Sequence, residues 1–368
     1  MMLAFLGILI GLIPGLHVNL IAPLIKNVEN FSFIVVSIAL MANFFEFLRS
    51  SLFYSPGEGD VLTVHPMRRL TEEGRFLYGI KLLALGGLGG VLLSVVFHPL
   101  LLSLIPFVYY EVKPLIPFLL LLISVHLILK DKVLWALTYF SLSGLLGLCA
   151  LNSNMREPLL PLLTGMFGIS SLLSVKKPFK RQMKMVSFIL DKVDVMKGLF
   201  LGFFSSFALS VIPSIGPSQA SMIGAEFERK RKDEVFLISI GCINTSDVLL
   251  SLFSLEAIGK ARLGAFSYIR EVNLPLLLLV SLLTAFFSYF LLIKLSYFLS
   301  KRLEKMNLSL LKSSLLSLIS FLCFYLDGFK GVLVLFFSTL LGLLAERKSV
   351  MKSHGMGCLI IPTLLYYL

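Results

Sequence analysis

The sequence predicts an all-α polytopic membrane protein built from two inverted repeats, each with one re-entrant broken-helix hairpin and about five transmembrane helices. Hydrophobic residues make up 57% of the 368 residues, and mean hydropathy is +0.92. Apolar runs longer than about 18 residues recur along the chain, as membrane helices require. Two proline-interrupted segments divide the chain, and basic residues gather in alternate loops. A β-barrel is disfavoured because runs such as 274–299 are apolar on every face.

The first broken segment spans residues 7–23. Pro14 removes a backbone N–H and Gly15 adopts non-helical conformations readily, so no regular helix continues through this point. A break at membrane depth is tolerated where the backbone faces protein or a wet cavity, and the polar side chains of His17 and Asn19 follow it. We therefore expect two short arms of about 10 to 14 residues that meet at a polar tip. His17 is either a structural residue or a proton relay.

The second broken segment, residues 202–224, repeats this pattern, with Pro213 in the place of Pro14. Half-helix ends at such a tip offer free N–H groups to an anion and free carbonyls to a cation. The alternative is an ordinary proline kink closed by serine hydroxyls. The candidate substrate-binding residues of the two tips are Pro14, Gly15, His17, Asn19, Pro213, Ser214, Gly216, Pro217, Ser218 and Gln219.

Five further apolar stretches follow each broken segment. They are expected at 31–54, 76–106, 114–129, 133–151 and 156–175, and at 233–254, 273–299, 308–326, 328–346 and 355–368. Because five is an odd number, the second repeat is inverted relative to the first, an arrangement typical of secondary transporters. The predicted units are a first repeat at 1–178, a basic cytoplasmic linker at 179–196 and a second repeat at 197–368.

Loop charges give the predicted orientation. If each broken segment returns to the side from which it entered, loops on one side carry 23 of the 33 Lys and Arg residues and loops on the other carry seven. The positive-inside rule then places the 176–197 region in the cytoplasm and both termini outside. The net charge of +12 is explained by these loops, so we expect a multi-pass protein of the plasma membrane with no nucleic-acid partner. A homo-oligomer is left open.

An Asn-x-x-acid element lies in the first full span of each half. Asn43 and Glu46 form the first, and Asn244 and Asp247 form the second, 201 positions later. The spacing puts amide and carboxylate on one helix face, and a carboxylate at membrane depth by default marks an ion or proton pathway. These four residues are the ion-coupling candidates. The alternatives are that Glu46 only pairs with Arg49, and that Asp247 lies in an N-terminal helical turn near the interface.

Nothing in the sequence indicates a bound cofactor or a metal site. The four cysteines are scattered singly, and there is no zinc-type Cys/His cluster and no calcium loop. The glycine-rich stretch 86–90 lies inside an apolar helix, which predicts close helix packing and not a phosphate loop. Sodium or a proton is expected only as the coupling ion.

Several motifs resemble the large membrane subunit of the tripartite tricarboxylate transporters, the TctA family, in its stand-alone archaeal-type branch. They are GLIPGLHVN at 11–19, HPMRRLTEEG at 65–74, PLLTGMFGISSLL at 161–173, IPSIGPSQASMIG at 212–224 and GCLIIP at 357–362. The resemblance implies an ion-coupled carrier that imports carboxylates with a small membrane subunit and an extracytoplasmic solute-binding protein. It also implies a central site lined by Pro14, Gly15, Pro213, Ser214, Gly216 and Pro217.

The sequence favours a membrane transporter, and two kinds of transporter are left open. The first is a secondary active symporter of a small, carboxylate-like organic anion, bound between the two tips at the bilayer midplane. The second is a polyprenyl-phosphate translocase, since a similar paired hairpin design occurs in such lipid carriers. A membrane-embedded enzyme is disfavoured, because the chain has no HExxH, no GxSxG and no aspartate-rich diphosphate motif.

Overall fold

The computed structural model describes residues 5–13, 16–53, 64–174, 190–211, 232–302 and 307–367, and these ranges contain helices and no strand. The elements in chain order are α1 (Leu6–Leu12), α2 (Val18–Ile25), α3 (Phe31–Phe53), α4 (Val64–Glu72), α5 (Phe76–Val112), η2 (Lys113–Leu115), α6 (Ile116–Leu129), α7 (Val133–Leu151), α8 (Leu159–Leu163), η3 (Thr164–Ile169), α9 (Ser170–Ser174), α10 (Lys192–Val211), α12 (Asp233–Ile258), η4 (Gly264–Tyr268), α13 (Leu274–Ser300), α14 (Leu308–Lys348), η6 (Lys352–Met356) and α15 (Gly357–Tyr367). The all-helical membrane class is confirmed: seven helices in these ranges are long and apolar enough to cross a bilayer.

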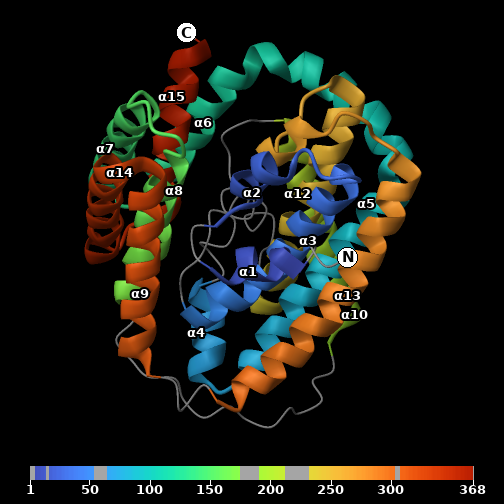
Figure 1. Ribbon diagram of the computed structural model, residues 1–368, viewed down its shortest axis with the longest axis horizontal. Helices are drawn as coiled ribbons and strands as arrows, with labels where there is room; N and C mark the ends of the chain where they lie inside the picture. The colour runs from blue at the N-terminus through green and yellow to red at the C-terminus, as the bar shows by residue number, and fades with distance from the viewer. Residues whose placement is uncertain are drawn as a thin grey trace.

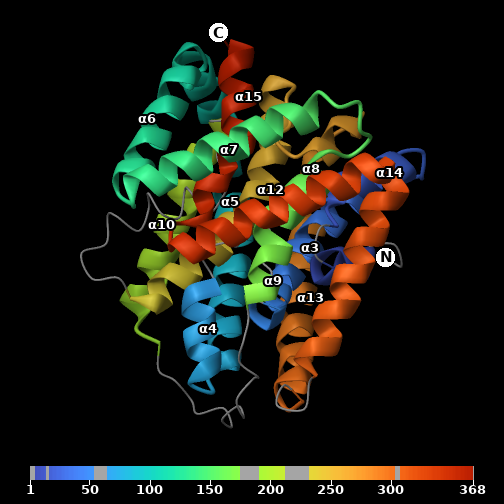
Figure 2. The same cartoon turned by 90° about the vertical axis from the view of Figure 1, so that its left-hand side faces the viewer.

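The seven helices differ from the ten expected spans for identifiable reasons. The stretches at 76–106 and 114–129 form one continuous helical run from α5 through η2 to α6, which curves over the top of the molecule in Figure 1. The stretches at 308–326 and 328–346 are the two parts of α14, which breaks sharply between them (Figure 2). The bend lies at Gly328, whose φ of 61° and ψ of −147° suit only glycine.

Two expected spans are shorter than a membrane crossing. The apolar helices at Leu159–Ser174 include a π-helical stretch, Thr164–Ile169, and α15 has only 11 residues. The expected arms of about 10 to 14 residues were wrong for both broken segments, because α1 and α2 have 7 and 8 residues and α10 has 20. The first residue of α10, Lys192, falls inside the range predicted as linker. The inverted-repeat relation and the unit boundaries stay predictions.

The helices form two groups, each with a main hydrophobic core, and a third, smaller cluster joins α8 and η3 to α14. The larger core draws on α3, α5, α12 and α13, and the next on α6, α7, α14 and α15 together with Ile243 of α12 and Leu209 of α10. In Figure 1 the second group, with α7, α8, α9 and α14, lies to the left of the first. Each core combines residues from the first and second halves of the chain. The sequence boundary between the two halves is therefore not the boundary between the two groups.

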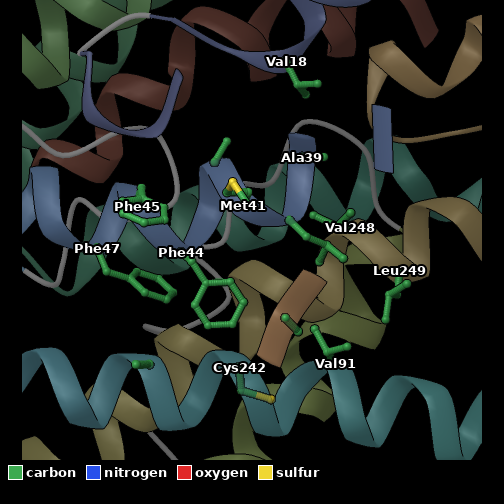
Figure 3. Packing of buried hydrophobic residues seen from close by; sticks show 14 of the residues in the cluster. Val18, Ala39, Met41, Phe44, Phe45, Phe47, Val91, Cys242, Val248 and Leu249 are labelled. Carbon is green, nitrogen blue, oxygen red and sulfur yellow. The ribbon is translucent and has the colours of Figure 1, made fainter. Parts of the chain in front are cut away.

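Helices α3 and α12 lie at the centre of the larger group. In their most apolar windows 72% and 89% of the residues are buried, against 22% to 33% for the other five candidate spans. Phe44 and Phe47 of α3 point toward Val91 of α5 and Cys242 of α12 (Figure 3). The outward faces of the other spans expose large apolar side chains, as a lipid-facing surface requires.

Small residues allow α5 and α12 to approach closely. A Cβ added to Gly86 would lie 2.1 Å from the carbonyl oxygen of Ile238, and one added to Gly90 would lie 2.6 Å from that of Cys242. On the facing helix, a Cβ added to Gly241 would lie 2.2 Å from the carbonyl oxygen of Leu83. The glycine-rich stretch thus packs helices together, which confirms the prediction made for it.

Candidate functional site

A cavity of about 580 Å³ lies between the two helix groups. On one side it is lined from α1, α2, α3 and α12, and on the other from α8, η3 and α15. Most of its lining is apolar, with a few polar and charged groups, as is usual for small-molecule sites. Among the predicted site residues that the structure describes, six face this cavity: His17, Asn19, Asn43, Glu46, Asn244 and Asp247.

The two Asn-x-x-acid elements meet beside the cavity. Nδ2 of Asn43 on α3 donates a hydrogen bond of 2.6 Å to the backbone carbonyl oxygen of Asn244 on α12. Asn244 is only 4% exposed. Since both elements follow the i, i+3 spacing, this contact also brings Glu46 and Asp247 to the same cavity. The sequence predicted their matching places, and the fold places them together.

Glu46 forms an ion pair with Arg49, one turn further along α3. Arg49 is 4% exposed, and its Nη1 donates a hydrogen bond of 3.4 Å to the carbonyl oxygen of Ile13. Both side chains line the cavity. The pairing considered from the sequence is therefore confirmed, and it occurs inside the candidate site. Arg49 thereby connects the carboxylate to the C-terminal end of α1.

Asp247 pairs with an arginine from a different part of the chain. Its Oδ1 lies 3.4 Å from Nε of Arg262, in the segment between α12 and η4. Nη1 of Arg262 donates a hydrogen bond of 2.6 Å to the carbonyl oxygen of Leu209 on α10. Asp247 lies near the middle of the 26-residue α12. The alternative placing in an N-terminal turn is therefore wrong.

The two pairs share one arrangement. Each consists of a carboxylate on a central helix, an arginine, and a carbonyl oxygen at the end of the helix that precedes a proline tip. Ile13 immediately precedes Pro14, and Leu209 lies four residues before Pro213. Each arginine therefore joins an acid at the cavity to the helix that leads into one tip.

His17 and Asn19 lie at the start of α2. The N-cap residue His17 accepts a hydrogen bond of 3.3 Å at Nδ1 from the backbone N–H of Asn19, and its side chain is exposed toward the cavity. Oδ1 of Asn19 accepts a hydrogen bond of 2.8 Å from the backbone N–H of Ala265. Asn19 therefore anchors α2 to η4, and contact of either side chain with substrate stays a prediction.

The remaining tip residues lie outside the part of the chain that the structure describes. They are Pro14, Gly15, Pro213, Ser214, Gly216, Pro217, Ser218 and Gln219. The expected meeting of the two tips near the bilayer midplane therefore stays a prediction.

Sequence reasoning missed Arg49 and Arg262 as site residues, and also Glu157, which faces the cavity from the segment before α8. Arg49 carried a signal, because its position in an apolar span beside Glu46 is costly unless it is used. Arg262 carried none, since it lies in a connecting segment, whereas Glu157 is a carboxylate at the start of the stretch expected at 156–175. Within the described ranges, no group of three or more His, Cys, Asp or Glu could hold a metal ion.

Comparison with known proteins identifies the family of this chain. Residues 1–357 match the family described as "Tripartite tricarboxylate transporter TctA family". A similar protein, "Uncharacterized protein MJ1079" of Methanocaldococcus jannaschii, is 26% identical over 384 residues, which cover 98% of this chain and 96% of that relative. No solved structure matches the chain. The family match spans almost the whole sequence and confirms the predicted resemblance, so this multi-pass membrane protein belongs to the TctA family, a family of transporters and not of enzymes.

Proposed function

We propose that this protein is a secondary active transporter that binds a small carboxylate-type organic anion in the cavity between the two helix groups. The observation that carries this proposal is the pair of arginines, Arg49 and Arg262, facing one cavity. A guanidinium group binds a carboxylate through two parallel hydrogen bonds, which gives both strength and orientation. Membership of the TctA family favours a carboxylate over a polyprenyl phosphate.

The size of the cavity supports a small substrate. Pockets for small molecules commonly measure about 300 to 1,000 Å³, and this one is about 580 Å³. Its position between two helix groups also suits a carrier, because movement of one group against the other can change the side from which the cavity opens.

We propose that a gradient of sodium or protons across the membrane drives transport by symport. Glu46 and Asp247 are the proposed coupling residues, because both face the cavity from the two most enclosed helices, α3 and α12. We further propose the plasma membrane as the location, with the 176–197 region in the cytoplasm. The tripartite character of the family supports a small membrane subunit and a solute-binding protein as partners.

Thermal stabilisation of the purified protein tests this proposal. Citrate, succinate and a polyprenyl phosphate are added separately, each with and without sodium. A carboxylate present at 100 times its dissociation constant stabilises the folded state by about 2.7 kcal/mol, and sodium is expected to increase the shift. Stabilisation by the polyprenyl phosphate alone would contradict the proposal and support the lipid-carrier alternative.

A matched pair of variants on α15 locates the binding site. Thr363 lines the cavity, whereas Leu365 is 55% exposed on the outer surface. Thr363→Trp fills the cavity and is expected to abolish the carboxylate-dependent shift. Leu365→Trp adds the same bulk outside the cavity and should leave the shift unchanged. Equal shifts in both variants would place the substrate elsewhere.

A further inference from the structure

The geometry points to a binding mechanism, which rests on the proposed function: Arg49 and Arg262 each bind one carboxylate of a substrate with two carboxylates, and the substrate replaces Glu46 and Asp247 as their partners. We propose this exchange of partners as the link between substrate and coupling ion.

The donors of Arg49 are only partly used. Its Nη1 and Nη2 groups contact Ile13 and Glu46, while Nε is buried with no hydrogen-bond partner among the described residues. Asp247 Oδ1 likewise has no hydrogen-bond partner there, and it lies 3.4 Å from Nε of Arg262 as an ion pair. A buried donor of Arg49 and a buried acceptor of Asp247 are therefore left unsatisfied, which is costly. A substrate carboxylate that engages Nε and one Nη atom of Arg49 would use the donors of that arginine better.

The charges of the cavity require compensation when an anion enters. Across the two pairs, the carboxylates of Glu46 and Asp247 balance the guanidinium groups of Arg49 and Arg262. The cavity is also lined by the carboxylate of Glu157 and the imidazole of His17. A dianion added to this balanced set would leave two uncompensated buried charges, which costs several kcal/mol per ion.

The exchange resolves this imbalance. When the substrate carboxylates take over the two arginines, the displaced side chains of Glu46 and Asp247 each need a cation. Sodium or a proton can neutralise each of them, so two cations enter with each dicarboxylate. The inference therefore predicts a stoichiometry as well as a binding mode, and it assigns the two acids to the cations and the two arginines to the substrate.

The same exchange reaches the tips. Arg49 and Arg262 also hold the carbonyl oxygens of Ile13 and Leu209, at the ends of α1 and α10. A guanidinium group that turns toward a substrate changes its contact with these helix ends. Each arginine is therefore placed to report substrate binding to the helix that leads into one proline tip.

Equilibrium binding of succinate and of butyrate, its matched monocarboxylate, tests the exchange. At pH 7, Arg49→Gln and Arg262→Gln should each weaken succinate binding by about 10- to 100-fold and butyrate binding much less, because a monocarboxylate needs only one arginine. Arg270→Gln is the control, since Arg270 is exposed and lies outside the cavity. If either glutamine variant unfolds, Arg49→Lys and Arg262→Lys replace it, because lysine retains the charge without the planar pair of donors. Each lysine variant should again weaken succinate binding more than butyrate binding.

The acid variants give the decisive result. Glu46→Gln and Asp247→Asn remove the competitor for each arginine, so each should tighten succinate binding and should reduce by one the number of cations bound with it. Weaker succinate binding in both acid variants, or unchanged binding in both arginine variants, would overturn the exchange. A wild-type protein that binds neither citrate nor succinate would instead overturn the proposed function itself.

Discussion

Nδ2 of Asn43 lies 2.6 Å from the backbone carbonyl oxygen of Asn244, and this hydrogen bond joins two elements that are 201 residues apart in sequence. It connects α3 to α12, the two most enclosed of the candidate spans. Because Glu46 and Asp247 are each one turn further along these helices, the contact fixes the relative position of the two carboxylates. The Asn-x-x-acid elements are therefore parts of one site.

Asn43→Leu should lower both stability and transport. The variant removes the hydrogen bond that the Asn43 side chain donates to the Asn244 carbonyl oxygen, and a bond of this kind contributes about 0.5 to 1.5 kcal/mol to stability. Asn152→Leu is the control, because Asn152 is exposed at the end of α7 and its Nδ2 bonds within the same helix end. Thermal unfolding of both variants checks this prediction. Equal midpoints would show that the Asn43 contact contributes nothing particular to α3 and α12.

Gly86→Ala should destabilise the pairing of α5 with α12. The added Cβ would lie 2.1 Å from the carbonyl oxygen of Ile238, so the helices must separate. Overpacking of this kind costs about 1 to 3 kcal/mol. Val96→Ala on the same helix is the comparison, because Val96 is 69% exposed. Denaturant titration in detergent should show a lower free energy of unfolding for Gly86→Ala and an unchanged one for Val96→Ala. An equal decrease for Val96→Ala would count against close packing as the cause.

His354 should make stability depend on pH. Its Nε2 lies 3.1 Å from Oδ2 of Asp131, a contact that joins the segment after α6 to η6. Burial lowers the pKa of His354 below its ordinary value, although the hydrogen bond and charge of Asp131 oppose this shift. The unfolded chain therefore takes up a proton first as pH falls through about 6.5, and the unfolding free energy decreases.

Thermal unfolding between pH 7.5 and pH 5 measures this effect. The wild type should lose stability toward pH 5, and His354→Gln should lose less. His126→Gln, which alters an exposed histidine on α6, should behave as the wild type does. A variant at His354 with an unchanged pH profile would remove this residue from the explanation.

The predicted orientation can be tested with single cysteines in a background that lacks the four native ones. Labels that do not cross the membrane should reach the 176–197 region only from the cytoplasmic side, because loops on that side carry 23 of the 33 Lys and Arg residues. Labelling of that region from outside would reverse the orientation of the whole chain.

Much of the fold could be predicted, because a sufficiently long run of apolar residues by itself indicates a membrane helix. The stretch expected at 31–54 is helix Phe31–Phe53, and that expected at 233–254 is Asp233–Ile258. Continuity was harder to predict at α5, since Pro99 and Pro106 lie within this helix without ending it, whereas the expected division between 308–326 and 328–346 matches the non-helical backbone at Gly328. Hydropathy reports which residues are apolar but not how two such stretches are joined.

The candidate site was predicted in part for a similar reason. Glu46 and Asp247 could be found because a carboxylate in an apolar stretch is conspicuous. Arg262 could not, because it lies in a connecting segment, and only the fold brings it beside Asp247 and Leu209. The pairing of an acid with an arginine in each half therefore depends on tertiary contacts that no local pattern in the sequence encodes.

Uptake of labelled succinate and citrate into proteoliposomes tests the central claim most directly. The protein is reconstituted alone, and sodium and proton gradients are imposed separately. The account predicts concentrative uptake of at least one of the two carboxylates by the wild type and by Leu365→Trp, driven by one of the gradients, and loss of that uptake in Thr363→Trp. Uptake that continues in a folded Thr363→Trp protein, or no uptake of either carboxylate by the folded wild type under either gradient, would contradict it.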